Sequence, residues 1–236
     1  MLFRSGPQQS VDSEKVPGTL DDYAFTIHAC IDAWMASGEM RYLHAAVKLA
    51  DAMIARFHDS AFGGFFDTAA PHEIPLGALS ARRKPLQDAP APAGNSTAAA
   101  ALIRLEALSG RKQYRDIAED TLASFAGIVE HFGLYAGSYG LAAERLLLDP
   151  VQVVIVGSGA EAARLEALAV ARFAVNKTVI RIDPARLVAS ELPQALAETL
   201  LQVPPPSGAA VWAMVCRGRT CLPPITDGEA LLKAME

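Results

Sequence analysis

The chain has 236 residues, of which 51% are hydrophobic and 20% are charged, and its net charge is -5 at pH 7. This composition is typical of a folded protein that buries a sizeable core in one large domain or two small ones. The acidic balance argues against a nucleic-acid partner, and no apolar run reaches the ~18 residues that a membrane span needs.

Residues 1–19 form an N-terminal segment that we expect to be disordered. These residues lack the charged-then-apolar order of a signal peptide. The whole chain contains three cysteines, which are too few for a disulfide scaffold. A cytoplasmic protein with reduced thiols is therefore the default expectation.

Residues 20–149 have the periodicity of amphipathic helices arranged in hairpins. Helices are predicted over 20–37 and 39–59, and the intervening Ser37-Gly38 leaves room only for an antiparallel turn. A second pair covers 95–133, with Asn95 or Ser96 as its N-cap and Gly110 at its turn, and one more helix covers 137–149. In both pairs the second helix follows a Ser-Gly turn and begins with a charged residue and an aromatic. This repetition predicts a stacked array of helical hairpins.

The segment between the two pairs, residues 60–94, is rich in glycine and proline. It is too long for a plain connection, so we expect a functional or capping loop. Beyond Pro150 the pattern changes: strands are predicted near 151–157, 177–183 and 208–218, and helices lie between and after them. This alternation predicts a small α/β unit over 150–236 with a short parallel sheet.

One motif in the α/β unit resembles a dinucleotide-binding fingerprint. Gly157, Gly159 and Ala162 follow the first strand in nearly the required spacing, and Asp183 ends the second strand. A tight strand-to-helix turn also needs small residues, and an isolated fingerprint is a weak signal. We therefore favour the structural explanation and expect no NAD, FAD or other cofactor.

The helix starts carry the candidate active-site residues. Asp21 and Asp22 are candidate catalytic residues, as a general acid or base or as acceptors for sugar hydroxyls. Helix capping is the structural alternative for these residues. The helix that begins near Asp21 and the helix that begins near Asn95 are each the first helix of a hairpin. Their starts should therefore lie at the same end of the array. The residues expected to bind substrate beside them are Tyr23, Phe66, Asn95 and Ser96.

Cys216 and Cys221 flank a short Arg-Gly-Arg-Thr segment near the C-terminus. They are redox candidates, and in a reducing cytosol we expect two thiols that can pair reversibly. No nearby side chains complete a zinc site, so we expect no bound metal.

Four sequence segments carry a resemblance to a known family: LDDYAF at 20–25, GGFFDT at 63–68, GNS at 94–96 and VCRGRTCLPPITD at 215–227. The chain resembles the C-terminal third of the thioredoxin-domain-containing proteins related to spermatogenesis-associated protein 20. This resemblance implies a thioredoxin-like domain with a Cys-x-x-Cys motif, followed by a six-hairpin glycosidase-like toroid. The chain has no such motif and too few helices for six hairpins.

The resulting fold prediction is mainly α: a partial (α/α) six-hairpin toroid segment over 20–149 and a small α/β unit over 150–236. The chain looks like a piece of a longer protein, so its partners would include the missing thioredoxin-like and toroid segments. By this resemblance the longer protein binds or acts on a carbohydrate-like small molecule. A non-catalytic interaction or scaffold module is the alternative, and a dinucleotide-binding oxidoreductase is a distant third. The sequence leaves open whether any reaction is catalysed.

Overall fold

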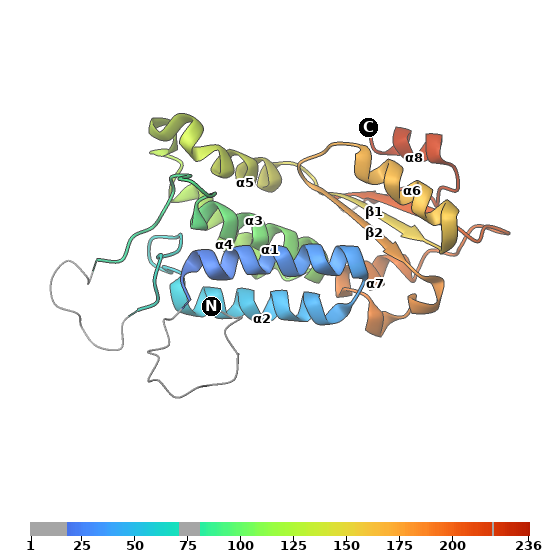
Figure 1. The fold of residues 1–236 in the computed structure, drawn as a ribbon, viewed down its shortest axis with the longest axis horizontal. Helices are drawn as coiled ribbons and strands as arrows, with labels where there is room; N and C mark the ends of the chain where they lie inside the picture. The colour runs from blue at the N-terminus through green and yellow to red at the C-terminus, as the bar shows by residue number, and fades with distance from the viewer. Residues whose placement is uncertain (1–17, 71–80, 219) are drawn as a thin grey trace.

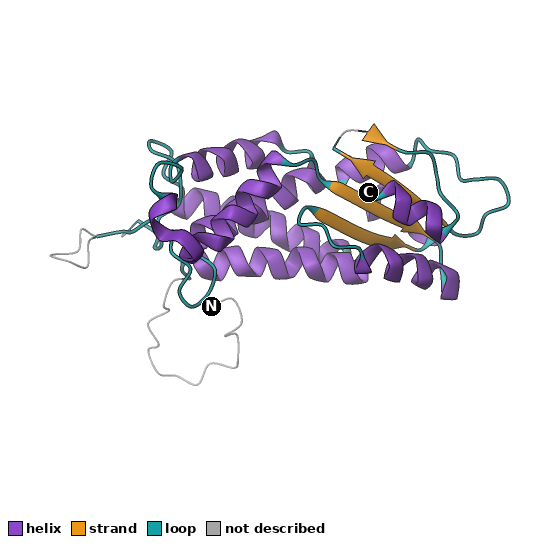
Figure 2. Cartoon of the chain, turned by 90° about the horizontal axis from the view of Figure 1, so that it is seen from above, coloured by secondary structure: helices purple, strands orange, loops and turns teal. Residues whose placement is uncertain are grey.

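A computed structural model describes residues 18–70, 81–218 and 220–236 (Figure 1). The molecule is elongated, with helical hairpins in one half and a small sheet with its helices in the other (Figure 2). Of the segment 1–19 that we expected to be disordered, residues 1–17 lie outside the described residues. Thr19 is the N-cap of the first helix.

Two helical hairpins with the same turn make up the first half. They consist of α1 (Leu20–Ser37) with α2 (Met40–Phe57), and α3 (Gly94–Ser109) with α4 (Lys112–Ala123). Gly38 and Gly110 each end the first helix with φ at 69°. A side chain is strained in this left-handed conformation and glycine is not, which explains the glycine at both turns.

The serine before each glycine repeats as well. Ser37 Oγ donates to Ala33 O at 2.7 Å, and Ser109 Oγ donates to Leu105 O at 2.6 Å. The predicted internal repeat is therefore confirmed at the level of individual hydrogen bonds in the turns.

The second hairpin departs from the predicted pattern after its turn. α4 ends at Ala123, and turns and the 3-10 helix η2 (Val129–Ala136) follow, where we had predicted one helix to residue 133. Gly133 adopts φ 51° within η2, which interrupts regular helix. The next helix, α5 (Gly137–Leu147), packs on α3 and α4.

The α/β unit begins at β1 (Val151–Val156) and contains one sheet of four strands in the order β2-β1-β3-β4. Its remaining elements are α6 (Gly159–Ala171), β2 (Lys177–Ile182), the 3-10 turns η3 (Pro184–Arg186) and η4 (Ala189–Glu191), α7 (Gln194–Leu200), β3 (Trp212–Arg217), β4 (Thr220–Cys221) and α8 (Gly228–Ala234). β1 and β2 are parallel, but β3 is antiparallel to β1 and β4 is antiparallel to β3. The expected parallel sheet is thus a mixed one.

The chain path explains this reversal. After β2 the chain runs along the end of α1 and then forms α7, which packs on α3. It returns to the sheet at Val211, whose atoms contact Gly157 just beyond the end of β1. β3 therefore enters at the carboxyl edge of β1 and has to run in the opposite direction.

The sheet is covered on both faces. Val154, Val156 and Met214 belong to the core shared with the hairpins and α7, while Val153 and Ile155 pack with α6 and α8. Burial on both faces explains why β1 is apolar almost throughout. The hairpins and the α/β unit therefore share one core across residue 150.

Candidate functional site

The starts of α1 and α3 lie together at the end of the molecule away from the sheet (Figure 1). Leu20 N donates to Asp67 O at 2.9 Å, which ties the loop after α2 to the start of α1. Gly94 packs against the Asp21 carboxylate so closely that a Cβ at this position would collide with it. The residues expected to form one pocket therefore come from neighbouring elements.

Asp21 and Asp22 have different environments despite their adjacency. Asp22 Oδ2 accepts from Thr19 N at 2.9 Å and from Thr19 Oγ1 at 3.1 Å, so it closes a capping box. The hydrogen bond from the Thr19 backbone lowers the pKa of Asp22. Partial burial, together with the charges of Asp22 and Asp67, raises the pKa of Asp21. Asp21 is thus the better candidate for a group that carries a proton.

The two aromatic residues of the predicted site are half-buried. Tyr23 packs edge-on against Phe57, with ring centroids 5.3 Å apart. The Phe66 ring is covered by Arg82 at 3.9 Å and Lys84 at 5.1 Å. A sugar that stacks on the ring face under Arg82 has to displace this cation.

Asn95 and Ser96 are both 1% exposed, so a ligand in solvent does not reach them. Asn95 Oδ1 accepts from Phe65 N at 2.6 Å, and its Nδ2 donates to Phe65 O and Pro85 O at 2.9 Å each. Its side chain therefore joins two loops to α3. The predicted N-cap role is wrong: Ala93 is the N-cap, and it makes no side-chain capping bond. Ser96 Oγ is buried without a hydrogen-bond partner in the described part of the chain.

The described part of the long loop is held by Asp88. Its carboxylate accepts from Ala93 N at 2.8 Å and from Ser138 N at 2.8 Å, which links the loop to the start of α5. Residues 71–80 of this loop, which we expected to be functional or capping, lie outside the described residues.

Cys216 and Cys221 form a disulfide, where we had expected two thiols that pair reversibly. They are directly opposed on the antiparallel strands β3 and β4, with Cα atoms 3.9 Å apart. The tight turn at Gly218, where φ is 54°, produces this register. Both residues therefore remain redox candidates, now in the oxidised form.

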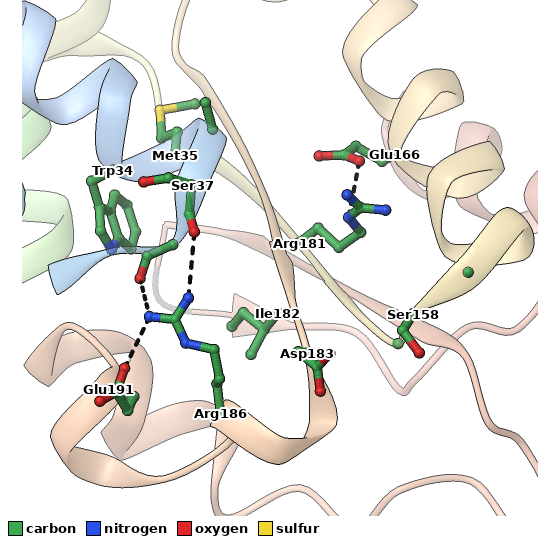
Figure 3. A pocket seen from close by; sticks show the side chains of 14 residues that line it. Trp34, Met35, Ser37, Ser158, Glu166, Arg181, Ile182, Asp183, Arg186 and Glu191 are labelled. Carbon is green, nitrogen blue, oxygen red and sulfur yellow. Dashed lines mark hydrogen bonds and ion pairs between the residues drawn. The ribbon is translucent and has the colours of Figure 1, made fainter.

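A cavity of about 310 Å³ lies at the other end of α1, between this helix and the sheet (Figure 3). Its walls come from the last turn of α1, the β1–α6 loop, the end of β2 and the η3–η4 segment. Sequence reasoning had singled out Gly157, Gly159 and Asp183 here, but not Arg181 or Arg186. These arginines belong to no spacing motif; their only signal was a position at the end of a predicted strand or shortly after it.

Arg186 joins the two halves of the molecule at this cavity. Its Nη2 donates to Gly38 O at 2.9 Å and pairs with Glu191 at 2.9 Å, and its Nη1 donates to Ser37 O at 3.4 Å. A cation at the C-terminal end of α1 also complements the helix dipole. Arg186 therefore has a structural role beside the cavity.

The described residues hold neither a metal-binding cluster nor a membrane-spanning helix. In residues 18–70, 81–218 and 220–236 no three His, Cys, Asp or Glu side chains group in a way that could hold a metal ion. No helix in the same ranges is long and apolar enough to cross a membrane.

The fold is that of a helical-hairpin segment with a small α/β unit on a shared core, and comparison with known proteins identifies its relatives. No family model matches the chain. It is 31% identical to human spermatogenesis-associated protein 20 over 241 aligned residues, which cover 98% of this chain and 29% of the human protein. The rat protein of the same name is 34% identical over 126 residues, which cover 52% of the chain and 15% of that protein.

The chain is therefore related to spermatogenesis-associated protein 20 along nearly its whole length. It spans less than a third of the length of this relative.

Proposed function

We propose that this chain acts as the C-terminal part of a longer protein with a thioredoxin-like domain, and that its hairpins complete a six-hairpin glycosidase-like toroid. In this arrangement the end where α1 and α3 begin would bind a carbohydrate-like ligand. The observation that carries the proposal is the position of Asp21, a partly buried carboxyl group with a raised pKa at the start of α1, which lies against Gly94 at the start of α3. Carboxyl groups whose pKa is raised serve as general acids in glycoside hydrolysis.

The proposal is tested by isothermal titration calorimetry with neutral sugars such as glucose, N-acetylglucosamine and cellobiose. We expect the Asp21→Asn variant to bind the preferred sugar at least about tenfold more weakly, because the neutral amide no longer makes charge-assisted hydrogen bonds with the sugar hydroxyls. The matched control is Asp116→Asn, which removes an exposed carboxylate paired with Lys112 on α4. Equal affinity of the Asp21→Asn variant and the native chain for every sugar would contradict the proposal.

A non-catalytic interaction module is the second candidate, and exposed apolar side chains on η2 and α5 favour it. Leu134 is 97% exposed and Leu147 is 81% exposed, and Tyr135, Leu141 and Leu148 are also exposed. Side chains of this size lose about 1.5–3 kcal/mol each by remaining in water. Adjacent helical hairpins of the parent protein would cover such a surface.

This candidate predicts that the isolated chain associates. Light scattering should detect oligomers that shrink in the double variant Leu134→Glu with Leu147→Glu. The control is Leu222→Glu, which changes an exposed leucine beside β4 in the other half. A compact, reversibly folding monomer at all concentrations would count against an interaction surface on η2 and α5.

A further inference from the structure

The cavity at the end of α1 lies where the connections of two parallel strands diverge. The β1–α6 loop leads to one face of the sheet, where α6 packs, whereas the segment after β2 leads to the other face, where α7 packs. In open α/β sheets the crevice outside the carboxyl ends of the strands at such a point is where ligands bind. A cavity of about 310 Å³ at this point is at the lower end of the size range of small-molecule sites.

The polar groups around this cavity are only partly used within the protein. Arg181 pairs with Glu166 through Nε at 3.2 Å, and in the part of the chain described its terminal nitrogens have no partner. Ser158 is the N-cap of α6, but its side chain makes no capping hydrogen bond. Asp183 accepts from Ala185 N through Oδ1, which leaves Oδ2 for another donor. A cation, a hydroxyl and a carboxylate oxygen thus remain for a ligand (Figure 3).

The backbone also permits a ligand to approach the β1–α6 loop closely on one side. A Cβ at Gly157 would lie 2.8 Å from Val211 Cγ2, so Gly157 is needed for packing. Gly159, by contrast, has no atom within 4 Å of the position of a Cβ, and its φ is 77°. The first turn of α6 is therefore open at Gly159, and its amide groups favour an anionic group there.

We propose that this cavity binds a small sugar phosphate. The phosphate would contact Arg181, Ser158 and the first turn of α6, and Asp183 would accept hydrogen bonds from the vicinal hydroxyls of the sugar. The small volume favours one sugar phosphate over a dinucleotide, which agrees with the expectation that NAD and FAD do not bind. The site is independent of the proposed carbohydrate site, because the 18 residues of α1 place the two sites about 27 Å apart.

The test uses intrinsic fluorescence, because Trp34 lines the cavity and is one of only two tryptophans in the chain. The probes are ribose 5-phosphate, ribose, inorganic phosphate and NADH. We expect saturable binding of ribose 5-phosphate, with ribose and phosphate each at least about tenfold weaker, since each makes only part of the contacts. No saturation by ribose 5-phosphate up to ~10 mM would overturn the proposal. So would ribose or phosphate binding as tightly, or NADH binding more tightly.

Variants separate the two parts of the ligand. Arg181→Gln should weaken both ribose 5-phosphate and inorganic phosphate about tenfold, because it removes a charge-assisted contact. Asp183→Asn should weaken ribose 5-phosphate only, and it keeps the oxygen that accepts from Ala185 N. The control Lys112→Gln breaks an exposed ion pair with Asp116 on α4, away from the cavity lining, and should change neither affinity.

Melting curves of all variants check their folding. A folded Arg181→Gln variant with native affinity would refute the assignment of the phosphate site. Asp21→Asn should leave ribose 5-phosphate binding unchanged, so this proposal and the carbohydrate proposal can fail separately.

Discussion

The two ends of α1 use their polar side chains in opposite ways. At the start of the helix Asp22 binds Thr19, Asn95 binds three backbone groups and Asp88 binds the start of α5. At the other end Ser158 and part of Asp183 and Arg181 remain available around a cavity. The residues most suggestive of a site in the sequence are thus largely those that hold the fold.

This difference has a physical cause. Helix starts and long loops leave backbone N–H and C=O groups without partners, and buried polar side chains are the means of satisfying them. At the cavity Arg186 and Asp183 Oδ1 satisfy backbone groups in the same way. Ser158, Asp183 Oδ2 and the terminal nitrogens of Arg181 are not used for this purpose within the described residues, and so they are free to contact a ligand.

The largest effect is expected when a polar side chain that holds the fold together at the starts of α1 and α3 is removed. Asn95→Leu leaves Phe65 N, Phe65 O and Pro85 O without partners, so we expect a loss of about 3–4 kcal/mol in the free energy of unfolding. Urea denaturation measures it, with the exposed Gln113→Leu as a control. An unchanged unfolding free energy together with lost sugar binding would instead make Asn95 a substrate-binding residue.

The second effect concerns His28, which lies between the two ends of α1. Its Nε2 lies 3.1 Å from Thr97 O and its Nδ1 lies 2.9 Å from Arg104, an arrangement that suits the neutral ring. Burial, followed by the charge of Arg104, lowers the pKa of His28 to about 4. The unfolded chain then binds a proton below about pH 6.5 that the folded chain does not bind until about pH 4.

The free energy of unfolding should therefore fall by roughly 2–3 kcal/mol as the pH drops from about 6.5 to about 4. Urea denaturation at several pH values measures this fall. His28→Gln should remove most of this pH dependence, while His44→Gln, at an exposed position on α2, should retain it. An equal pH dependence in both variants would show that His28 does not carry the effect.

The third effect concerns the α/β unit, where the disulfide between Cys216 and Cys221 joins the strands β3 and β4. Because Cys216 and Cys221 are only five residues apart, the closed loop is short and its loss costs about 2 kcal/mol. Thiol titration of the unreduced protein should find one thiol, Cys30, and reduction should raise the number to three. Three thiols before reduction would restore the original expectation of two free thiols at this position.

Sequence patterns predicted the features that depend on local chemistry. The Ser-Gly turns follow from the conformational freedom of glycine, and β1 follows from an unbroken apolar run. The direction of β3 could not be read in the same way, because an apolar strand looks alike in either direction and only the path through α7 decides it. Asn95 was misassigned because an asparagine that caps a helix and one that bridges loops look the same in sequence.

The cavity illustrates the remaining limit. Arg181 and Arg186 are brought to the end of α1 by packing between residues about 150 positions apart in the sequence, as the hydrogen bond from Arg186 to Gly38 shows. No spacing motif encodes such a contact. The sequence showed Gly157, Gly159 and Asp183 as a partial dinucleotide-binding fingerprint. It did not show that the last turn of α1 would close the cavity beside them.

The smallest effect is expected at Ser96, and it allows a direct comparison of neighbouring buried side chains at the start of α3. Ser96 is as deeply buried as its neighbour Asn95, yet its hydroxyl has no partner among the residues that the structure describes. Removing an unsatisfied buried hydroxyl relieves its desolvation cost, and alanine favours helix, so Ser96→Ala should be neutral or stabilising by up to about 1 kcal/mol. Thr97→Val is the matched control, since it removes a buried hydroxyl that donates to Ala93 O at 2.9 Å and should destabilise the fold by about 1 kcal/mol. Urea denaturation of the two variants gives the comparison. If Ser96→Ala instead costs as much as Thr97→Val, the hydroxyl of Ser96 has a hydrogen-bond partner in solution.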